Sequence, residues 1–449
     1  MNQFGEPILN SNINNKLMKF RKSAYFIALI ASFFLFSCSS SDETGGSVTP
    51  PPVSTVTSIV LSSDKTSFDE GGSVIFTVKT NLNATVTSES SFKVNGTSIS
   101  GNTYTPTSPG TYSVVATHST FTSNQVTLTV NEVATVTSIE ITSSELALAI
   151  GQVTNFNVVA TYSDGSTEDK TDECQYVVNN TIFNGSGYLA TEVGAITAKA
   201  TFSSLTSNEI TIQVSDVSLP TTYTKKAIIE DYTGTWCGWC PRVSYAISLV
   251  EAETDKVFAV GAHIGDAMQN TYSSALDTAF DIPGYPSAFV NRAAEWDYPE
   301  PSNVAQAVNT AQGSTNVGLA VGATLDGSTM NILVSTGFAE SVSGTKIVVF
   351  VLEDGILANQ ANYTSYYGGG SNLSNFEHNH VLRYSATAVL GDDTDSGTGL
   401  THKPYSVNLS SYAVSNVANT AVLAFLTDET GKVVLNAQYT KVNQSTSFD

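Results

Sequence analysis

Cysteine is scarce in this chain, whose 449 residues include only four, at positions 38, 174, 237 and 240. A small exported domain stapled by disulfides needs a higher density of cysteine, so we expect hydrophobic cores to stabilise this fold. Charged residues are also few, at 13%, and 19 Lys and Arg stand against 40 Asp and Glu. A net charge of -21 disfavours binding to phosphates, so we expect no nucleic-acid partner.

Motifs for cofactor chemistry are missing as well. The sequence has no Gly-rich phosphate loop, no nucleophile elbow and no basic stripe. A zinc site at 237–240 would need two more ligands, and His263 alone is insufficient. Haem attachment needs a histidine after the second cysteine, where Pro241 stands. We therefore expect no cofactor and no metal.

A hydrophobic run at 24–36 has 13 residues, fewer than the roughly 20 that span a bilayer. Lys19, Arg21 and Lys22 precede it, as in a signal peptide. The run ends at LFSC, which resembles a lipobox with Cys38 as the lipid acceptor. We interpret residues 1–37 as a lipoprotein signal peptide. The alternative is a plain secretory signal followed by a chance cysteine.

Residues 38–54 are rich in Ser, Thr, Gly and Pro and predict a flexible tether. Their start, SSSDE after Cys38, resembles the export tether of surface lipoproteins in the Bacteroidetes. Ser39 at the next position fits sorting to the outer membrane. We expect membrane attachment through a lipid on Cys38, with the protein facing either the periplasm or the cell surface.

An internal repeat follows the tether. TVTSI at 55–59 recurs at 135–139, and ATHSTFTSNQVTLTV at 116–130 recurs as ATFSSLTSNEITIQV at 200–214. Period-2 alternation between turns predicts a β-sandwich in each copy. The copies, at 55–131 and 132–216, resemble bacterial Ig-like domains, and the second resembles the BIG2 type. We interpret them as spacers and expect Cys174 to be a small buried side chain in a strand.

After a linker at 217–222 the pattern changes to strands alternating with helices, which is typical of an α/β domain over 223–313. We expect strands at 226–231, 257–260 and 287–290, and helices after Cys240, at 271–280 and at 302–311. Alternation returns in 314–449, which predicts a C-terminal β-sandwich with a long loop at about 358–380. The predicted fold class is multidomain and mainly β, with one α/β domain among three sandwiches.

The sequence Trp236-Cys237-Gly238-Trp239-Cys240 lies between a strand and a helix of this α/β domain. A thiol at a helix N-terminus has a lowered pKa, and the thiolate is the form that attacks disulfides. We therefore expect an exposed Cys237 to attack and Cys240, one turn inward, to resolve the mixed disulfide. The competing interpretation is an inert structural disulfide between the two residues.

IIEDYTGTWCGWCPR at 228–242 and GYPSAFVNR at 284–292 resemble the thioredoxin-like domain of Omp28-related outer-membrane lipoproteins. The resemblance covers about 222–449, most sharply at these two motifs. It implies that Pro286, preceded by Tyr285, is the cis-proline that faces the cysteine pair. It also implies that Asp231 is a buried acid that assists proton transfer, although a surface acid beside Glu230 is equally consistent.

Other residues leave alternatives open. Trp236 and Trp239 could form a substrate-binding surface or belong to a core. His378-Asn379-His380 could bind metal or belong to a nuclease triplet, but a loop or sheet edge is the simpler interpretation. A last group resembles a calcium loop, with a solvated turn as the simpler reading: Asp392, Asp393, Asp395 and Gly397.

Two function hypotheses follow. In the first, a cell-envelope lipoprotein performs thiol–disulfide exchange on exported proteins, whose thiols or disulfides are its partners. In the second, it is a surface adhesion or ligand-binding lipoprotein in which the Cys237–Cys240 pair is structural. The spacing of the cysteines does not distinguish oxidation, reduction and isomerisation.

Overall fold

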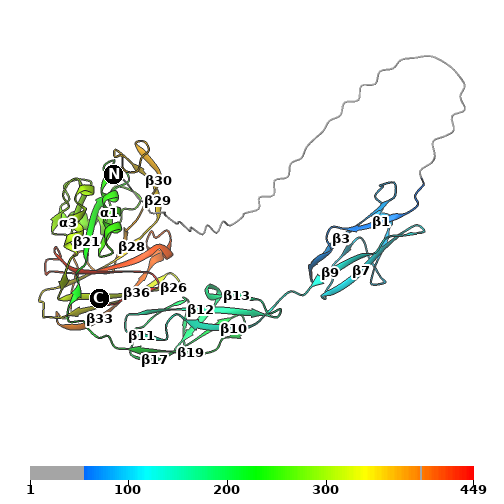
Figure 1. The fold of residues 1–449 in the computed structure, drawn as a ribbon, viewed down its shortest axis with the longest axis horizontal. Helices are drawn as coiled ribbons and strands as arrows, with labels where there is room; N and C mark the ends of the chain where they lie inside the picture. The colour runs from blue at the N-terminus through cyan, green and yellow to red at the C-terminus, as the bar shows by residue number, and fades with distance from the viewer. Residues whose placement is uncertain (1–54, 395–396) are drawn as a thin grey trace, which may run out of the picture. The chain divides into compact units, whose positions relative to one another are not determined.

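The computed structural model describes residues 55–394 and 397–449, which divide between two compact units, Met1–Asn131 and Glu132–Asp449 (Figure 1). Strands predominate, and the α-helices of the described ranges all belong to the second unit. The multidomain, mainly β fold class is confirmed. Within the described residues no helix is both long and apolar enough to cross a membrane. Cys38 and its flanking tether lie outside the described residues.

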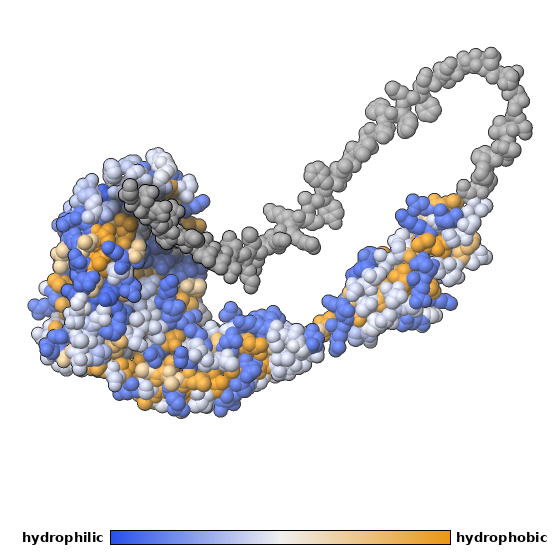
Figure 2. Space-filling view, viewed as in Figure 1, coloured by the Kyte–Doolittle hydropathy of each residue, from blue (hydrophilic) through white to orange (hydrophobic). Residues whose placement is uncertain are grey.

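The first unit is a β-sandwich built from alternating sequence. One sheet has the order β1-β3-β6 and the other β2-β9-β7-β4-β5, with β8 beside β7. Inward residues such as Phe76, Phe92 and Leu128 form its core, while their neighbours in sequence face solvent. Figure 2 accordingly shows hydrophobic and hydrophilic residues interspersed on its visible face. The strands are β1 (Ile59–Ser63), β2 (Ser67–Asp69), β3 (Val74–Thr80), β4 (Ser91–Val94), β5 (Thr97–Ile99), β6 (Thr103–Tyr104), β7 (Gly110–His118), β8 (Phe121–Thr122) and β9 (Val126–Asn131).

The repeat reappears as a second sandwich with matching topology. In both copies a short strand pairs in parallel with the last strand, β2 with β9 and β11 with β19. Asn124 bonds to the backbone of Leu61, and Asn208 bonds in the same way to Ile141. The strands are β10 (Val136–Ser143), β11 (Ala147–Ala149), β12 (Val153–Tyr162), β13 (Thr167–Asp169), β14 (Gln175–Val178), β15 (Thr181–Phe183), β16 (Gly187–Leu189), β17 (Gly194–Phe202), β18 (Leu205–Thr206) and β19 (Ile210–Ser215).

Cys174 precedes β14 instead of lying within a strand. It is half-buried, packs against the core of this second sandwich and is a free thiol. Its strand position was therefore predicted wrongly by one residue, because the 3-10 turn Thr171–Glu173 ends directly before it.

The second sandwich packs closely on the C-terminal sheet of the same unit. The amide of Val153 donates to Ser445 Oγ at 3.0 Å, and Gln152 Nε2 to Ser447 Oγ at 3.1 Å. A Cβ on Gly322 would lie 2.1 Å from the carbonyl oxygen of Gly151, so glycine permits this approach. This module is therefore part of a larger packed body, which the spacer interpretation did not anticipate.

One nine-stranded sheet continues from the α/β segment into the C-terminal region, in the order β24-β23-β21-β22-β31-β28-β34-β35 with β32 beside β28. The joint is a parallel bridge between Gly261 of β22 and Val381 of β31. The sheet thus crosses the boundary expected near residue 313. Its strands are β21 (Ala227–Thr233), β22 (Val257–His263), β23 (Ser287–Val290), β24 (Ala294–Glu295), β28 (Lys346–Glu353), β31 (Val381–Ser385), β32 (Asp392–Asp393), β34 (Thr420–Thr427) and β35 (Val434–Lys441).

A four-stranded sheet, β33-β27-β26-β36, packs with β28 and β34 around the largest apolar cluster, which includes Val349, Val351 and Ala424. Its strands are β26 (Val317–Asp326), β27 (Thr329–Phe338), β33 (Gly399–Asn408) and β36 (Gln444–Thr446). A two-stranded pair joins β20 (Tyr223–Thr224) to β25 (Ser314–Thr315).

The helices are α1 (Pro241–Glu253), α2 (Thr271–Phe280) and α3 (Val304–Thr310). The bounds of α2 match the prediction, and Asn270 caps it in a capping box with Ser273. Helix α3 is shorter than predicted and begins after Asn303, because Ser302 belongs to the 3-10 turn Glu300–Ser302.

The prediction of a long loop at about 358–380 is wrong. Residues 356–378 form a hairpin of β29 (Ile356–Ala361) and β30 (Asn372–His378), which we call the covering hairpin. Few side chains of this hairpin are buried, so its sequence lacks the alternation of apolar and polar residues that predicts a strand. Gln360, Asn362 and His378 are its buried polar residues.

Candidate functional site

The cysteine pair lies between β21 and α1. All seven residues of β21 are buried, and the strand leads through Gly234 into the Cys-containing turn. Cys237 and Cys240 form a disulfide with an S–S distance of 2.05 Å. Helix α1 begins at Pro241 with Cys240 as its N-cap, so Cys237 lies one turn before the helix and not at its first position. Val243, Ile247 and Val250 form the expected apolar face of α1.

Cys237 is less accessible than the sequence suggested. The residue is 5% exposed and Cys240 is 1% exposed, so the expected exposed thiol is not observed. The cause is the covering hairpin, whose backbone runs beside the turn. The amide of Ala361 donates to the carbonyl of Thr235 at 2.8 Å, and that of Tyr363 to Gly238 at 2.7 Å.

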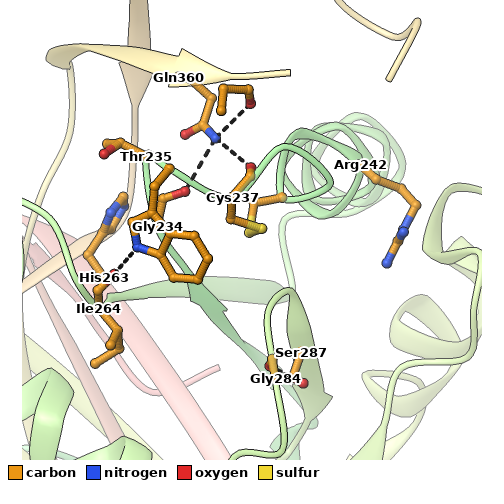
Figure 3. The surroundings of a disulfide bond; sticks show 12 residues. Gly234, Thr235, Cys237, Arg242, His263, Ile264, Gly284, Ser287 and Gln360 are labelled. Carbon is orange, nitrogen blue, oxygen red and sulfur yellow. Dashed lines mark hydrogen bonds between the residues drawn. A yellow bond between two sulfur atoms is a disulfide. The ribbon is translucent and has the colours of Figure 1, made fainter. Parts of the chain in front are cut away.

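Gln360 holds the covering hairpin to the Cys-containing turn. Its side chain is buried, and Nε2 donates to the carbonyl oxygens of Cys237 at 2.9 Å and Gly234 at 3.3 Å (Figure 3). The same nitrogen also bonds to Ala361 of its own strand at 3.0 Å. Gln360 therefore satisfies backbone groups on the side of the turn that the hairpin covers. The polar sequence around Gln360 gave no sign of this role.

The other side of the turn faces the loop of Tyr285 and Pro286, whose peptide bond is cis. Figure 3 shows this loop, through Gly284 and Ser287, below the disulfide. Trp236 packs edge-to-face on Tyr285, with ring centroids 5.6 Å apart, and its Nε1 donates to the carbonyl of Ile264 at 2.8 Å. The Tyr285 hydroxyl donates to Asp277 of α2.

Trp236 and Trp239 are both surface residues, 51% and 52% exposed. Trp239 packs edge-to-face on Tyr363 of the covering hairpin, with centroids 5.8 Å apart. Neither residue belongs to a core, which was one of the two alternatives that the sequence left open. The buried tryptophan of this region is Trp296, which is 2% exposed. Two half-exposed indole rings therefore flank the disulfide.

Asp231 lies in the interior, 4% exposed, so the surface-acid alternative does not apply. Burial raises the pKa of its carboxyl well above the usual range, and the nearby charge of Glu300 adds to the rise while Arg242 opposes it. Arg242 does not bind Asp231, because its Nε and Nη2 pair with Glu300. Asp231 Oδ1 is buried without a hydrogen-bond partner.

A cavity of about 530 Å³ adjoins Asp231, between α1, the β21–β22 part of the sheet and β30. Its lining combines polar and apolar side chains and contains no Lys or Arg. The residues are Asp231, Thr233, Ser244, Ile247, Ser248, Glu251, Ala259, Gly261, His263, Tyr367, Leu373, Ser374, Asn375, Phe376, Glu377, His378, Asn379 and His380.

Two buried histidines face this cavity. His263 Nδ1 bonds to Asp266 Oδ2 at 2.8 Å, and the His263 and His378 rings meet edge-to-face with centroids 5.2 Å apart. Burial lowers the pKa of His378 to about 4, and His263 contributes to that shift. His378 Nε2 has no hydrogen-bond partner. His378 ends β30 of a two-stranded pair, as the sheet-edge interpretation expected, and it also lines this cavity.

His380 also lines the cavity, and its side chain is partly exposed. Its Nε2 bonds to Glu251 of α1 at 2.8 Å, and its amide donates to Asp354 Oδ1 at 2.7 Å. Although burial alone would lower the pKa of His380, the bond to Glu251 raises it. No cluster of three or more His, Cys, Asp or Glu able to hold a metal occurs in the described part of the chain.

The calcium-type group is not assembled as a loop. Asp392 and Asp393 form β32, where Asp392 pairs with Ile347 and Asp393 with Lys346. Asp392 also accepts a hydrogen bond from the amide of Ala388. Asp395 lies outside the described residues.

Residues 273–446 match the family described as outer membrane protein Omp28. The match begins after the cysteine pair, so it covers α2, β23 and the C-terminal β-rich region. It includes one of the two motifs that carried the resemblance, GYPSAFVNR at 284–292, and leaves out the other, at 228–242. No curated protein matches the chain.

Solved structures resemble parts of the chain. HBP35 of Porphyromonas gingivalis is 19% identical over 49% of this chain and 76% of its own, with a TM-score of 0.41. A domain of the outer membrane lipoprotein Omp28 from the same organism is 19% identical over 29% and 89%, with a TM-score of 0.21. The surface layer protein SbsC, domains 1–6, is 17% identical over 38% and 30%, with a TM-score of 0.27. Neither activity nor ligand follows for this chain at such identities.

Proposed function

We propose that this chain, whose residues 273–446 match an outer-membrane protein family, is a lipid-anchored envelope protein that exchanges disulfides with exported proteins. Cys237 attacks a partner disulfide, Cys240 resolves the mixed disulfide, and Cys38 carries the lipid. The observation that supports this most is the Cys237–Cys240 disulfide directly before α1, in the turn that follows β21 with its buried Asp231, whose Oδ1 has no hydrogen-bond partner. Strongly perturbed carboxyls beside a redox pair are typical of functional sites.

The flanking side chains support a protein substrate. Trp236 and Tyr285 offer aromatic surface on the side of the turn that the covering hairpin leaves open, and the half-exposed Trp239 adds to it beside Tyr363 of that hairpin. Half-exposed aromatic rings are frequent anchors in protein interfaces. A polypeptide laid across them would bring its disulfide to Cys237, and access would be from this side alone.

The experiment is a trap in the full-length chain. With Cys240→Ser the reduced Cys237 thiol attacks a partner but cannot release it, so exported proteins should be recovered as mixed disulfides that DTT reverses. Cys237→Ser is the matched control and should trap none. Equal recovery from both variants, or none from either together with no reduction of a model disulfide by the wild type, would contradict the proposal.

A second candidate is an adhesion or ligand-binding protein with a structural Cys237–Cys240 bond. The burial of both cysteines beneath the covering hairpin favours it. It predicts that a Cys237→Ser/Cys240→Ser double variant retains the same partner in a pull-down from envelope extract, whereas the exchange proposal predicts that the partner is lost.

A further inference from the structure

We propose that the cavity beside α1 is the path by which Asp231 exchanges its proton with solvent, and that His378 and His263 carry that exchange. The inference rests on the proposed thiol–disulfide exchange and assigns a role to His378 of the covering hairpin that the proposed exchange itself does not use. It concerns a different group from the cysteines, so it can be tested separately from them.

The chemistry requires such a path. In the resolving step the Cys240 thiol gives its proton to the Asp231 carboxylate, and the resulting thiolate attacks the Cys237 sulfur of the mixed disulfide. The Cys237–Cys240 bond forms, the bond to the partner breaks, and the partner cysteine leaves as a thiolate that takes a proton from water. Two electrons have passed to the partner, and Asp231 must release its proton before the next cycle.

The geometry connects both groups to the cavity. Asp231 and Thr233 alternate along β21 and so face the same side of the sheet, where both line the cavity. Cys240 precedes Ser244 by one helical turn, which places it at the head of the α1 face that lines the cavity. Asp231 is otherwise enclosed, so the cavity is its route to water.

Two partnerless atoms mark the path. Asp231 Oδ1 and His378 Nε2 are buried without hydrogen bonds, although their residues are only 4% and 6% exposed. Native proteins leave few buried polar atoms unpaired, and water in an adjoining polar space is the ordinary partner. A volume of about 530 Å³ holds several waters, and both residues line it.

The histidines suit transfer between waters. Asp266 fixes the ring of His263 through Nδ1, which leaves its other nitrogen available. His378 stays neutral at physiological pH, so one ring nitrogen can accept a proton while the other releases one. The paired His380 and Glu251 also line the cavity and are partly exposed, so the path can reach solvent beside them.

The charged groups that face these residues come from every neighbouring element. Glu300, Arg242 and the Tyr367 hydroxyl face Asp231. His263 and Asp266 face His378. Glu251 and Asp354 face His380, and Glu377 also lines the cavity. The described lining contains no Lys or Arg, so the histidines are the side chains of that lining that can carry a positive charge when they take up a proton.

The test replaces His378 in the full-length chain. Infrared difference spectra between wild type and Asp231→Asn identify the carboxyl stretch of Asp231, and its shift after transfer to D₂O times the proton exchange. His378→Ala should slow that shift about a hundredfold, the lower end of the usual contribution of a positioned proton-transfer group. Added imidazole, which fits the vacated space, should restore it. His402→Ala is the control, because His402 bonds to Ser335 on the other sheet.

Rate measurements give the second readout. His378→Ala should also lower the rate of model-disulfide reduction and change its pH profile, with rescue by imidazole. An unchanged D₂O shift in His378→Ala, or a slowed shift that imidazole does not restore, would overturn the proposal. If His378→Ala alters tryptophan fluorescence, His378→Gln replaces it with the same criteria. A wild type without reductase activity would instead refute the proposed function, and the D₂O shift would still test the path.

Discussion

Glu230 and Asp231 are neighbours on β21 that project to opposite faces of the sheet and meet opposite electrostatic surroundings. Glu230 accepts two bonds from Arg292, whose Nη1 donates to the carbonyl of Gly431 and whose guanidinium lies 4.7 Å from the Phe425 ring. Asp231 has no such cation in contact and its pKa is raised. A buried carboxylate with a cation serves the fold, whereas one without a cation is free to gain and lose a proton.

The largest expected effect comes from breaking the ion pair between Arg292 and Glu230. Arg292→Ala leaves the Glu230 carboxylate buried without its cation, which typically costs about 3–5 kcal/mol in the free energy of unfolding. Urea unfolding followed by tryptophan fluorescence should show this, since Trp236, Trp239 and Trp296 all lie in this part of the chain. A loss below about 1 kcal/mol would mean that the ion pair is not structural.

Replacing Asp231, which has no cation in contact, should not lower the free energy of unfolding. Asp231→Asn removes a group that burial destabilises, so unfolding free energy should be unchanged or higher. Reduction of a model disulfide should nevertheless become roughly a hundredfold slower, because a general acid–base group contributes about that much. Stopped-flow kinetics beside the same urea curve would measure both. Lost stability with retained rate would reverse the assigned roles.

The pH dependence of stability sharpens the contrast. Because folding raises the pKa of Asp231, the folded chain keeps a proton that the unfolded chain releases. The stability from that proton is fully present below the unfolded pKa near 4 and is lost as pH rises through the folded pKa. Wild type should therefore lose stability relative to Asp231→Asn above pH 4, by at most about 1.4 kcal/mol per pH unit. The measurement is the free energy of unfolding of both proteins across this pH range. If the two values changed in parallel with pH, a raised pKa of Asp231 would be excluded.

The smallest expected effect on stability concerns Gln360, which holds the covering hairpin to the Cys-containing turn. Gln360→Ala leaves the carbonyls of Cys237 and Gly234 without their donor and should cost about 1 kcal/mol. Reduced Cys237 should then be alkylated faster, as the hairpin separates more often from the turn. Leu357→Ala, at an exposed position on the same strand, is the matched control. Equal alkylation rates in both variants would show that Gln360 does not restrict access.

Much of the fold followed from periodic sequence. The repeat predicted two sandwiches because each copy carries the same alternation, and α2 was placed correctly because apolar spacing and a polar start coincide at 271–280. The strand leading to Cys237 was also expected. These features depend on neighbours in sequence, which is the information that local patterns contain.

The missed features depend on distant pairs. Gln360 meets Cys237 across 123 residues, and Arg292 meets Glu230 across 62. A glutamine or arginine in the sequence does not indicate which partner it will meet. The bridge between β22 and β31 is likewise a long-range pairing, so the continuity of the sheet could not be predicted from alternation.

The most direct test of exchange at Cys237–Cys240 is the reduction potential of that bond. The full-length chain is equilibrated in glutathione or DTT buffers, thiols are alkylated and counted by mass, and Cys237→Ser supplies the background from the remaining cysteines. An exchange site should equilibrate between roughly -270 and -120 mV, the range of thiol–disulfide oxidoreductases. A potential below about -300 mV, as structural disulfides show, would contradict it.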